Sequence, residues 1–189
     1  MATTTKEIGD ILLPLHLKFD EEHNFHWGWS GGLNAYRDKD GDLTLYVAVH
    51  VSSDGESVLI AAPNVYNLAG CPHTRAVLEA LLAIGFTTKS VNYEYDKSDG
   101  EVRATVEFPI MDGAVNKEQI VRSLQLLTNV IDTMDPVVRH AMLTGQYDRS
   151  RAGLNSAAIA KRDLEDLVKQ VGGLDALRSL AERTKTNQP

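Results

Sequence analysis

Few side chains in this sequence have the type and spacing that catalysis requires, and Cys71 is the first to consider. It stands directly before Pro72 at the start of a predicted helix. There the helix dipole and the free backbone N–H groups would favour the thiolate. However, a free cysteine is commonly a small buried hydrophobe, and no second cysteine is present to resolve an oxidised one. Nucleophilic or redox use of Cys71 is therefore only an alternative hypothesis.

Two short polar motifs contain residues that could bind a metal ion. The run 38–42 alternates three carboxylates, as the first half of an EF-hand loop does, but its glycine is misplaced and no glutamate occupies the twelfth position. His23 and His26 lie beside two glutamates and could bind zinc, but no third ligand pattern follows. We interpret both motifs as solvated polar turns, and we predict no metal site.

The sequence also lacks the glycine-rich and nucleophile motifs of common enzymes. The segment 28–32 contains three glycines, but neither a lysine nor a helix follows it as in a phosphate-binding loop. Nucleophile elbows and dinucleotide fingerprints are absent. Carboxylates distant in sequence can still converge in a fold, so an enzyme that uses a carboxylate cluster is a further alternative. We predict a protein that is not an enzyme and needs no cofactor.

Composition and charge narrow the class of protein. The chain has 189 residues, of which 43% are hydrophobic and 24% charged, so one ordinary globular domain is the default expectation. A net charge of −7 disfavours binding to nucleic acid, because most of the surface repels phosphate. No apolar run approaches the roughly 20 residues that span a bilayer, and residues 1–10 lack the apolar core of a signal peptide. We expect a soluble cytoplasmic protein that does not contact membranes.

The charge divides the chain into two parts. Residues 146–189 contain eight basic and six acidic residues, a net +2, so residues 1–145 carry the remaining −9. The polar segment 144–153 has glycines near both ends and no apolar periodicity, which is typical of a hinge. We therefore predict an α+β domain over residues 1–145, followed by a hinge and a two-helix tail over 146–189.

Hydrophobic periodicity and Asp-Gly turns predict the elements of the first part. Asp-Gly pairs supply the positive φ angles that tight hairpins need, and alternating or 3.6-residue periods separate strands from helices. The predicted order is a helix, a three-strand antiparallel meander, a helix, a two-strand hairpin and a long helix. The corresponding ranges are 5–13, then 25–36, 43–51 and 57–62, then 72–84, then 91–95 and 102–108, and finally a helix capped by Asn116 that kinks or restarts at Pro136. In the tail, a helix capped by Asn155 or Ser156 precedes a shorter one over 174–180, while residues 14–20 remain ambiguous between helix and strand.

Two groups of apolar side chains are candidates for binding a partner protein. Trp27 and Trp29 share one face of the first predicted strand, and Tyr46 lies on the second. Aromatic residues are enriched at protein interfaces, although packing in the core is the competing explanation. The helix over 72–84 provides the second group: Val77, Leu78, Leu81 and Leu82.

The stretch Thr74 to Met142 resembles a known family. It contains ALLAIGF at 80–86 and YEYDKSDGEVRATVEFPIMDGAVNKEQIVRSLQLLTNVIDTMDP at 93–136. These motifs, and the order of elements over about 1–145, are similar to those of the YbjN-like bacterial proteins and of the type III secretion chaperone-like (Tir chaperone-like) fold that they share. The resemblance implies acidic cytoplasmic homodimers that bind an extended segment of another protein, or that act as stress regulators.

The sequence therefore favours a non-catalytic protein-binding module, either chaperone-like or a regulatory adaptor, that acts as a homodimer. Its partner would be a protein or peptide, received by the apolar residues named above. One alternative is a structural scaffold in which the tail helices swap onto the neighbouring subunit. The other is an enzyme that uses a carboxylate cluster or Cys71.

Overall fold

The protein was analysed as a computed structural model. The structure describes residues 5–12, 18–19, 25–29, 33–52, 54–88, 90–110, 115–170 and 172–173, and for 18–19 and 25–29 it describes the backbone alone. It divides the chain into two compact units, Met1–Gly153 and Leu154–Pro189.

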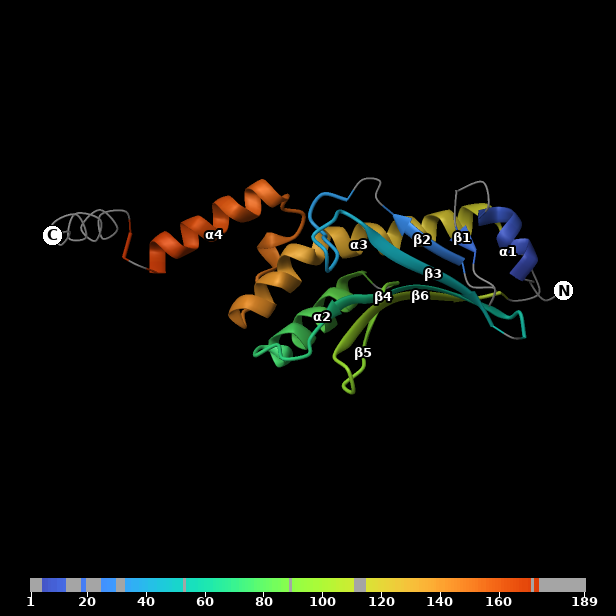
Figure 1. Cartoon of the computed structure of the whole chain (residues 1–189), viewed down its shortest axis with the longest axis horizontal. Helices are drawn as coiled ribbons and strands as arrows, with labels where there is room; N and C mark the ends of the chain where they lie inside the picture. The colour runs from blue at the N-terminus through green and yellow to red at the C-terminus, as the bar shows by residue number, and fades with distance from the viewer. Residues whose placement is uncertain are drawn as a thin grey trace. The chain divides into compact units, whose positions relative to one another are not determined.

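The first unit has the predicted α+β class, and Figure 1 labels its helices and strands. Among the described residues these elements are α1 (Thr5–Leu12), β1 (Lys18–Phe19), β2 (Phe25–Trp29), β3 (Leu45–Val51), β4 (Ser57–Asn67), α2 (Thr74–Thr88), β5 (Asn92–Tyr95), β6 (Glu101–Pro109), α3 (Lys117–Thr144) and a short 3-10 helix (Arg149–Arg151).

The strands form one antiparallel sheet in the order β1-β2-β3-β4-β6-β5. The predicted meander is present as β2, β3 and β4, and the predicted hairpin as β5 and β6. In the hairpin it is β6 that pairs with β4, so β5 lies at the edge of the sheet. Short Asp-Gly turns join β3 to β4 and β5 to β6, with positive φ angles of 70° at Gly55 and 83° at Gly100.

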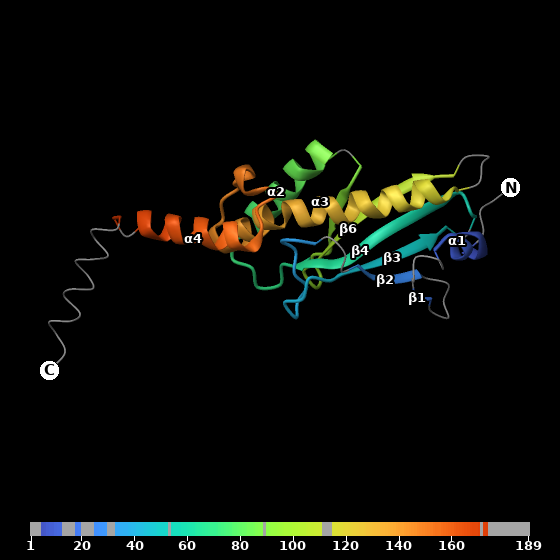
Figure 2. The ribbon, with the colours of Figure 1, turned by 90° about the horizontal axis from the view of Figure 1, so that it is seen from above.

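One face of the sheet is covered by α2 and α3. The helix α3 packs against β4 and β6, α2 packs against β5, and the two helices pack against each other. In Figures 1 and 2, α3 runs along the length of the strands. Alternate residues of the central strands, such as Val47, Ile60 and Ala104, point into the core between the layers and are buried. Ile8 of α1 joins the same core.

The helix α3 begins where the sequence predicted. The side chain of Asn116 accepts a hydrogen bond from the backbone N–H of Gln119, whose side chain accepts one in return from the N–H of Asn116. This capping box satisfies two N–H groups that the first turn of a helix leaves unpaired. The apolar stripe from Ile120 to Met134 is buried, as its 3.6-residue period indicated.

Several predicted boundaries were wrong. The helix α2 begins at Thr74, not Pro72, and continues through Gly85 to Thr88, where the hydroxyls of Thr87 and Thr88 donate to the carbonyl of Ile84. The helix α3 passes through Pro136 without ending. The strand predicted over 25–36 ends at Trp29, and β4 extends five residues beyond Ala62, to Asn67, through a bulge.

Residues after α3 are packed onto it. The N–H of Gly153 donates to the carbonyl of Thr133 at 2.7 Å, three residues before Pro136, and Arg151 is buried. Arg149 donates to the hydroxyl of Thr87 at 2.9 Å. The first unit therefore ends at Gly153, eight residues beyond residue 145, where we predicted the domain to end.

The second unit contains the helix α4 (Ser156–Gln170). The side chain of Asn155 accepts a hydrogen bond from the N–H of Ala158 and caps this helix, as the sequence suggested. Leu164 and Leu167 are exposed. The predicted second tail helix, 174–180, lies outside the described residues.

Candidate functional site

An exposed apolar surface lies on α2 beside the edge strand β5. Leu82 and Phe86 on α2 are 76% and 85% exposed. Leu78, Tyr93 and Tyr95 border the same open cavity, whose volume is about 440 Å³. We call these five residues the α2–β5 patch. Isolated exposed apolar residues are common on protein surfaces, whereas a contiguous group beside a free sheet edge is typical of an interaction site.

The sequence of α2 explains why it has an apolar surface on both sides. Val77, Ala80, Leu81 and Ile84 fill the face that packs into the core and are buried. Leu78, Leu82 and Phe86 recur every four residues and form a second stripe. A helix that is apolar on more than one face needs a further partner to bury it.

This arrangement places the predicted binding residues of the helix at different depths. Val77 is completely buried, and Leu81 is largely buried but borders the same cavity. Leu78 and Leu82 do lie at the surface of the patch. Phe86 was missed because the predicted helix ended before Gly85; its spacing of four residues from Leu82 was the signal that could have revealed it.

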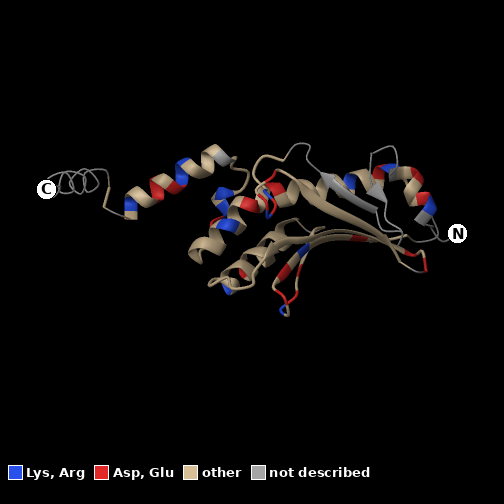
Figure 3. Cartoon of the chain, in the orientation of Figure 1, with Lys and Arg blue, Asp and Glu red and all other residues tan. Residues whose placement is uncertain are grey.

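Charge is sparse on α2. Its only charged residues, Arg75 and Glu79, form an exposed ion pair at 2.9 Å near the start of the helix. In Figure 3 most of α2 is accordingly drawn in the colour of uncharged residues. An uncharged surface of this kind can be buried without the cost of removing ions from water.

The aromatic residues predicted to bind a partner lie on β2 and β3. Trp27 is opposite Val47 in the strand register, and Trp29 is opposite Leu45. The side chains of both tryptophans lie outside the described part of the structure. Tyr46 is 45% exposed and lies at a second cavity, described next.

A second open cavity, of about 740 Å³, lies next to the loop between β2 and β3. Its wall includes Tyr36, Arg37 and Asp38 from that loop, Tyr66 from β4, and Arg139 from α3. At the bulge in β4 the backbone of Asn64 has a positive φ of 51°, and its N–H donates to Glu101 at 2.8 Å. Asparagine adopts such angles more readily than most residues other than glycine, and here it accommodates the bulge.

A buried carboxylate lies beneath this second cavity. Asp135 of α3 is 1% exposed, and both of its oxygens accept hydrogen bonds from the Nε of Arg139, at 2.9 and 3.0 Å. Tyr36 and Tyr66 lie close by with their rings edge to face, 6.4 Å apart. The hydroxyl of Tyr36 donates to the carbonyl of Val65, and the hydroxyl of Tyr66 is directed at the Asp135 carboxylate and lowers its pKa. Over the described residues, the buried hydroxyl of Tyr93 has no hydrogen-bond partner.

Burial and charge shift the pKa values in this cluster. Burial raises the pKa of Asp135 from 3.8 to about 6, although the charge and hydrogen bonds of Arg139 act in the opposite direction. Burial, followed by the negative charge of Asp135, raises the pKa of Tyr36 to about 12 and that of Tyr66 well above its usual range. The same two causes raise the pKa of Tyr93. The three tyrosines are therefore neutral at physiological pH.

Sequence reasoning missed this cluster. Asp135 directly precedes Pro136, where the sequence predicts a kink or a restart of the helix. The sequence therefore does not place Asp135 on the buried face of a continuous helix. The signal was its spacing of four residues after Ile131, which is itself buried. The tyrosines come from three separate elements, so their convergence on Asp135 is a property of the tertiary fold.

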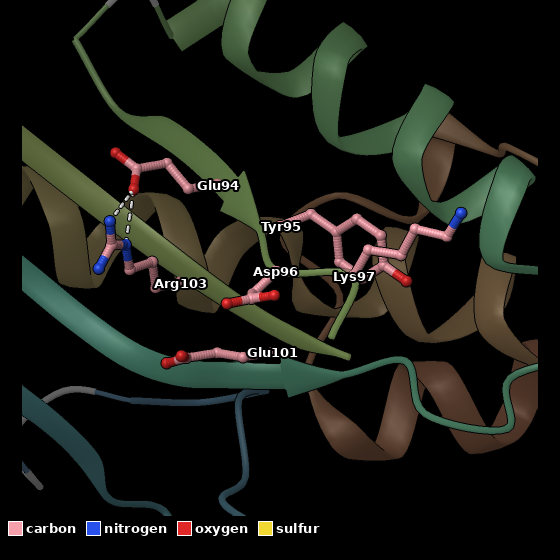
Figure 4. A pocket seen from close by; sticks show the side chains of 6 residues that line it. All are labelled: Glu94, Tyr95, Asp96, Lys97, Glu101 and Arg103. Atoms are coloured by element: carbon pink, nitrogen blue, oxygen red, sulfur yellow. Dashed lines mark hydrogen bonds and ion pairs between the residues drawn. The ribbon is translucent and has the colours of Figure 1, made fainter. Parts of the chain in front are cut away.

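A third, smaller cavity of about 270 Å³ lies at the hairpin of β5 and β6 (Figure 4). Figure 4 shows Glu94 and Arg103 joined across the two strands, where the Nε of Arg103 donates at 2.6 Å. Asp96 accepts from the hydroxyl and backbone N–H of Ser98, and these bonds lower its pKa. Glu101 accepts from Asn64. These carboxylates are all engaged in bonds that stabilise the turn.

The structure also places most of the residues that the sequence offered as candidates for catalysis or metal binding. Cys71 lies three residues before α2, so the predicted placement at the first turn of the helix was wrong; its thiol faces the carbonyl of Met142 at 3.9 Å. In the run 38–42, the carboxylate of Asp38 accepts the N–H groups of Asp40 and Asp42, as expected of a polar turn. His23 and the side chain of His26 lie outside the described residues.

Two further findings concern metal binding and membrane crossing. Over the ranges that the structure describes, no group of three or more His, Cys, Asp or Glu side chains is placed to hold a metal ion. Among the same residues, no helix combines the length and the hydrophobicity needed to cross a bilayer.

Comparison with solved structures confirms the predicted fold resemblance. YbjN of E. coli, a candidate transcription regulator, matches with a TM-score of 0.50 and 16% identity over 70% of this chain and 91% of YbjN. A chain of the ExsC–ExsE complex matches with a TM-score of 0.50 and 14% identity over 73% of this chain and 97% of that one. A chain of the HopA1–SchA chaperone–effector complex matches at 13% identity and a TM-score of 0.44, over 65% of this chain and 84% of its own.

The first two matches place this chain in the fold that YbjN and the ExsC–ExsE chain share. Identities of this size establish the fold and no more. No protein-family model matches the sequence, and no curated protein does.

Proposed function

We propose that this protein is a non-catalytic protein-binding module that acts in the cytoplasm as a homodimer, either as a chaperone-like protein or as a regulatory adaptor. The observation that carries the proposal is the α2–β5 patch. Leu82 and Phe86 are more than three quarters exposed on a helix whose charged residues lie near its start, beside β5 at the edge of the described sheet. The likeness of the fold to a chain crystallised in a two-protein complex supports the same class of function.

A second copy of the chain is the proposed occupant of the patch. Leu78, Leu82 and Phe86 lie along one helix at intervals of four residues, so two antiparallel copies of α2 would place the same apolar stripes in contact. Burying each leucine or phenylalanine contributes about 1.5–3 kcal/mol, and every contact occurs twice in a symmetric dimer. The five residues of the patch carry no charge, and Glu94, which borders the same cavity, is paired with Arg103.

The test is the oligomeric state of the full chain with Phe86→Asp. We expect the wild type to sediment as a dimer at micromolar concentration. The variant should weaken the dimer by at least 100-fold, because it places two charges in an apolar interface. The control is Leu143→Asp, a substitution at a position 77% exposed on α3 and outside the patch, which should leave the dimer intact.

The tail-swapped scaffold makes a different prediction for the same measurement. Its supporting observation is that α4 exposes Leu164 and Leu167, which form an apolar surface of their own. If removing residues 154–189 abolishes the dimer while Phe86→Asp does not, the scaffold hypothesis is correct and the patch is not the interface. A wild-type monomer at all accessible concentrations would contradict both.

A further inference from the structure

The loop between β2 and β3 is attached to α3 by a small number of polar contacts. One oxygen of the Asp132 carboxylate accepts the backbone N–H groups of Asn34, Ala35 and Tyr36 at 2.8–2.9 Å, and the second oxygen also accepts from Asn34 at 3.0 Å. Further along, Arg139 donates to the carbonyl of Arg37. We call residues 33–42 the strap.

The two ends of the strap are held differently. Leu33, Ala35 and Tyr36 are buried, but from Arg37 onward its residues are exposed or half-buried. Its far end is a turn closed on itself, in which Arg37 donates to the carbonyl of Gly41. Residues 37–42 are therefore of the kind that opens at a lower free energy than the core, whereas opening of 33–36 also requires Leu33 and Tyr36 to leave the core.

The strap closes over the buried carboxylate of Asp135. Its Tyr36 ring packs edge to face on Tyr66, and its Arg37 carbonyl receives the same guanidinium that holds Asp135. The titratable and charged groups around Asp135 come from every neighbouring element: Arg139 and Asp132 from α3, Tyr36 from the strap, Tyr66 from β4 and Tyr93 from β5. Only Arg139 among them is cationic, and its side chain is 44% exposed.

We propose that the strap opens and closes in response to the ionisation of Asp135: the closed strap favours the protonated carboxyl, and opening favours the ionised one. The physical reason is hydration. Opening returns water to a carboxyl group that is 1% exposed in the closed form, and water stabilises the charged form more than the neutral form. Proton binding and closure are therefore linked, and acidification should tighten the strap.

The direction of the pH response depends on whether burial or the charge of Arg139 has the larger effect on the pKa of Asp135. Burial outweighs the opposing attraction of Arg139 and raises its pKa to about 6, above the value expected once the group is hydrated. The linkage therefore acts between about pH 4 and pH 6, and the strap is loosest at neutral pH. Opening would expose the wall of the 740 Å³ cavity, which Tyr36 and Arg37 help to form.

Amide hydrogen exchange of the full chain tests the proposal. The N–H groups of Asn34, Ala35 and Tyr36 report opening directly, because each is bonded to Asp132 in the closed form. After correction for the intrinsic pH dependence of exchange, we expect their opening equilibrium constant to rise about 10-fold between pH 5.0 and pH 7.5. In Asp135→Asn the rise should disappear and the strap should remain protected at both values.

Two further measurements keep the test independent of how well that variant folds. In the wild type, the carboxyl ¹³C resonance of Asp135 should titrate with the same midpoint as the strap amides. In the matched variant Asp132→Asn, which removes the charge of the acceptor but not Asp135, the strap should be more open at both pH values and keep its pH response. A response that survives Asp135→Asn, or that vanishes in Asp132→Asn, would overturn the proposal.

Discussion

Asp135 is a buried ionisable residue whose charged form destabilises the fold. An ionised carboxyl group removed from water costs free energy, and a single partly exposed arginine offsets that cost in part. Beside it, the hydroxyl of Tyr93 is buried with no hydrogen-bond partner among the described residues. Natural cores seldom retain buried polar groups of this kind without a functional reason. The proposed pH response of the strap is such a reason.

The stability of the protein should reflect this conflict. A folded-state pKa of about 6, against 3.8 for the unfolded chain, means that Asp135 destabilises the fold above pH 6 and that the penalty is relieved as the pH falls toward 4. About two pKa units correspond to roughly 2–3 kcal/mol. Asp135→Asn should therefore gain unfolding free energy relative to the wild type at pH 7.5, and the gain should shrink at pH 5.0.

Urea denaturation of both proteins at the two pH values, at equal concentration, measures this difference. Comparing the two proteins removes the contribution of all the other titrating groups. A variant that loses stability equally at pH 5.0 and pH 7.5 would show that the bonds to Arg139 outweigh the cost of burial.

At the scale of elements, the Asp-Gly turn between β5 and β6 positions the hairpin that contains the edge strand β5. Gly100 follows Asp99 in the turn between β5 and β6, and its carbonyl accepts from the N–H of Leu68. This bond docks the hairpin against the turn that leads into α2. The two elements that form the α2–β5 patch are thus held together at this turn.

Replacing Gly100 by alanine should damage this contact severely. A Cβ atom at this position would lie 2.4 Å from the backbone nitrogen of Ala69, and φ is +83°. Gly41 is the matched control, because it has a φ of +88° but nothing within 4 Å of the added atom. We expect Gly41→Ala to cost about 1 kcal/mol, and Gly100→Ala about 3 kcal/mol or more.

Chemical denaturation gives both costs. Because the two substitutions share the same backbone strain, their difference isolates the steric clash. Equal costs would mean that the turn at 68–71 moves away without loss, and that the docking of the hairpin does not depend on it.

At the scale of the whole molecule, the chain consists of two compact units whose boundary is set by packing. The segment after α3 looks like a linker in the sequence, since it is polar and contains no apolar period. In the fold it carries the buried Arg151 and the bond from Gly153 to Thr133. Long basic side chains can contribute to packing through their aliphatic stems, which hydropathy patterns do not reveal.

Truncation should distinguish the two boundaries. Protein ending at Gly153 keeps every buried residue of the described core, so its unfolding free energy should match that of the full chain within about 0.5 kcal/mol. Protein ending at Gly145 loses Arg151 and the bond to Thr133, and should be less stable by about 1–3 kcal/mol. Thermal unfolding followed by circular dichroism compares them, and equal stability of the two proteins would assign residues 146–153 to the tail.

The sequence by itself determined the class of fold, the order of the elements from β2 to α3 and the α3 cap, but not β1. These features depend on local periodicity, on turn residues such as Asp-Gly, and on capping between neighbours. It also identified Leu78 and Leu82 as surface candidates. Helix periodicity identifies apolar positions, but it does not say which of two apolar faces packs against the core. The sequence therefore did not distinguish Val77 and Leu81 from Leu78 and Leu82.

Only the tertiary structure decided the rest. The placement of β5 at the sheet edge, the attachment of the strap through Asp132, and the convergence of three tyrosines on Asp135 all join residues far apart in the chain. Such contacts leave no periodic trace, since each residue is set by a different element. The pKa of Asp135 has the same origin, because burial is a property of everything packed around a group and not of its neighbours in sequence.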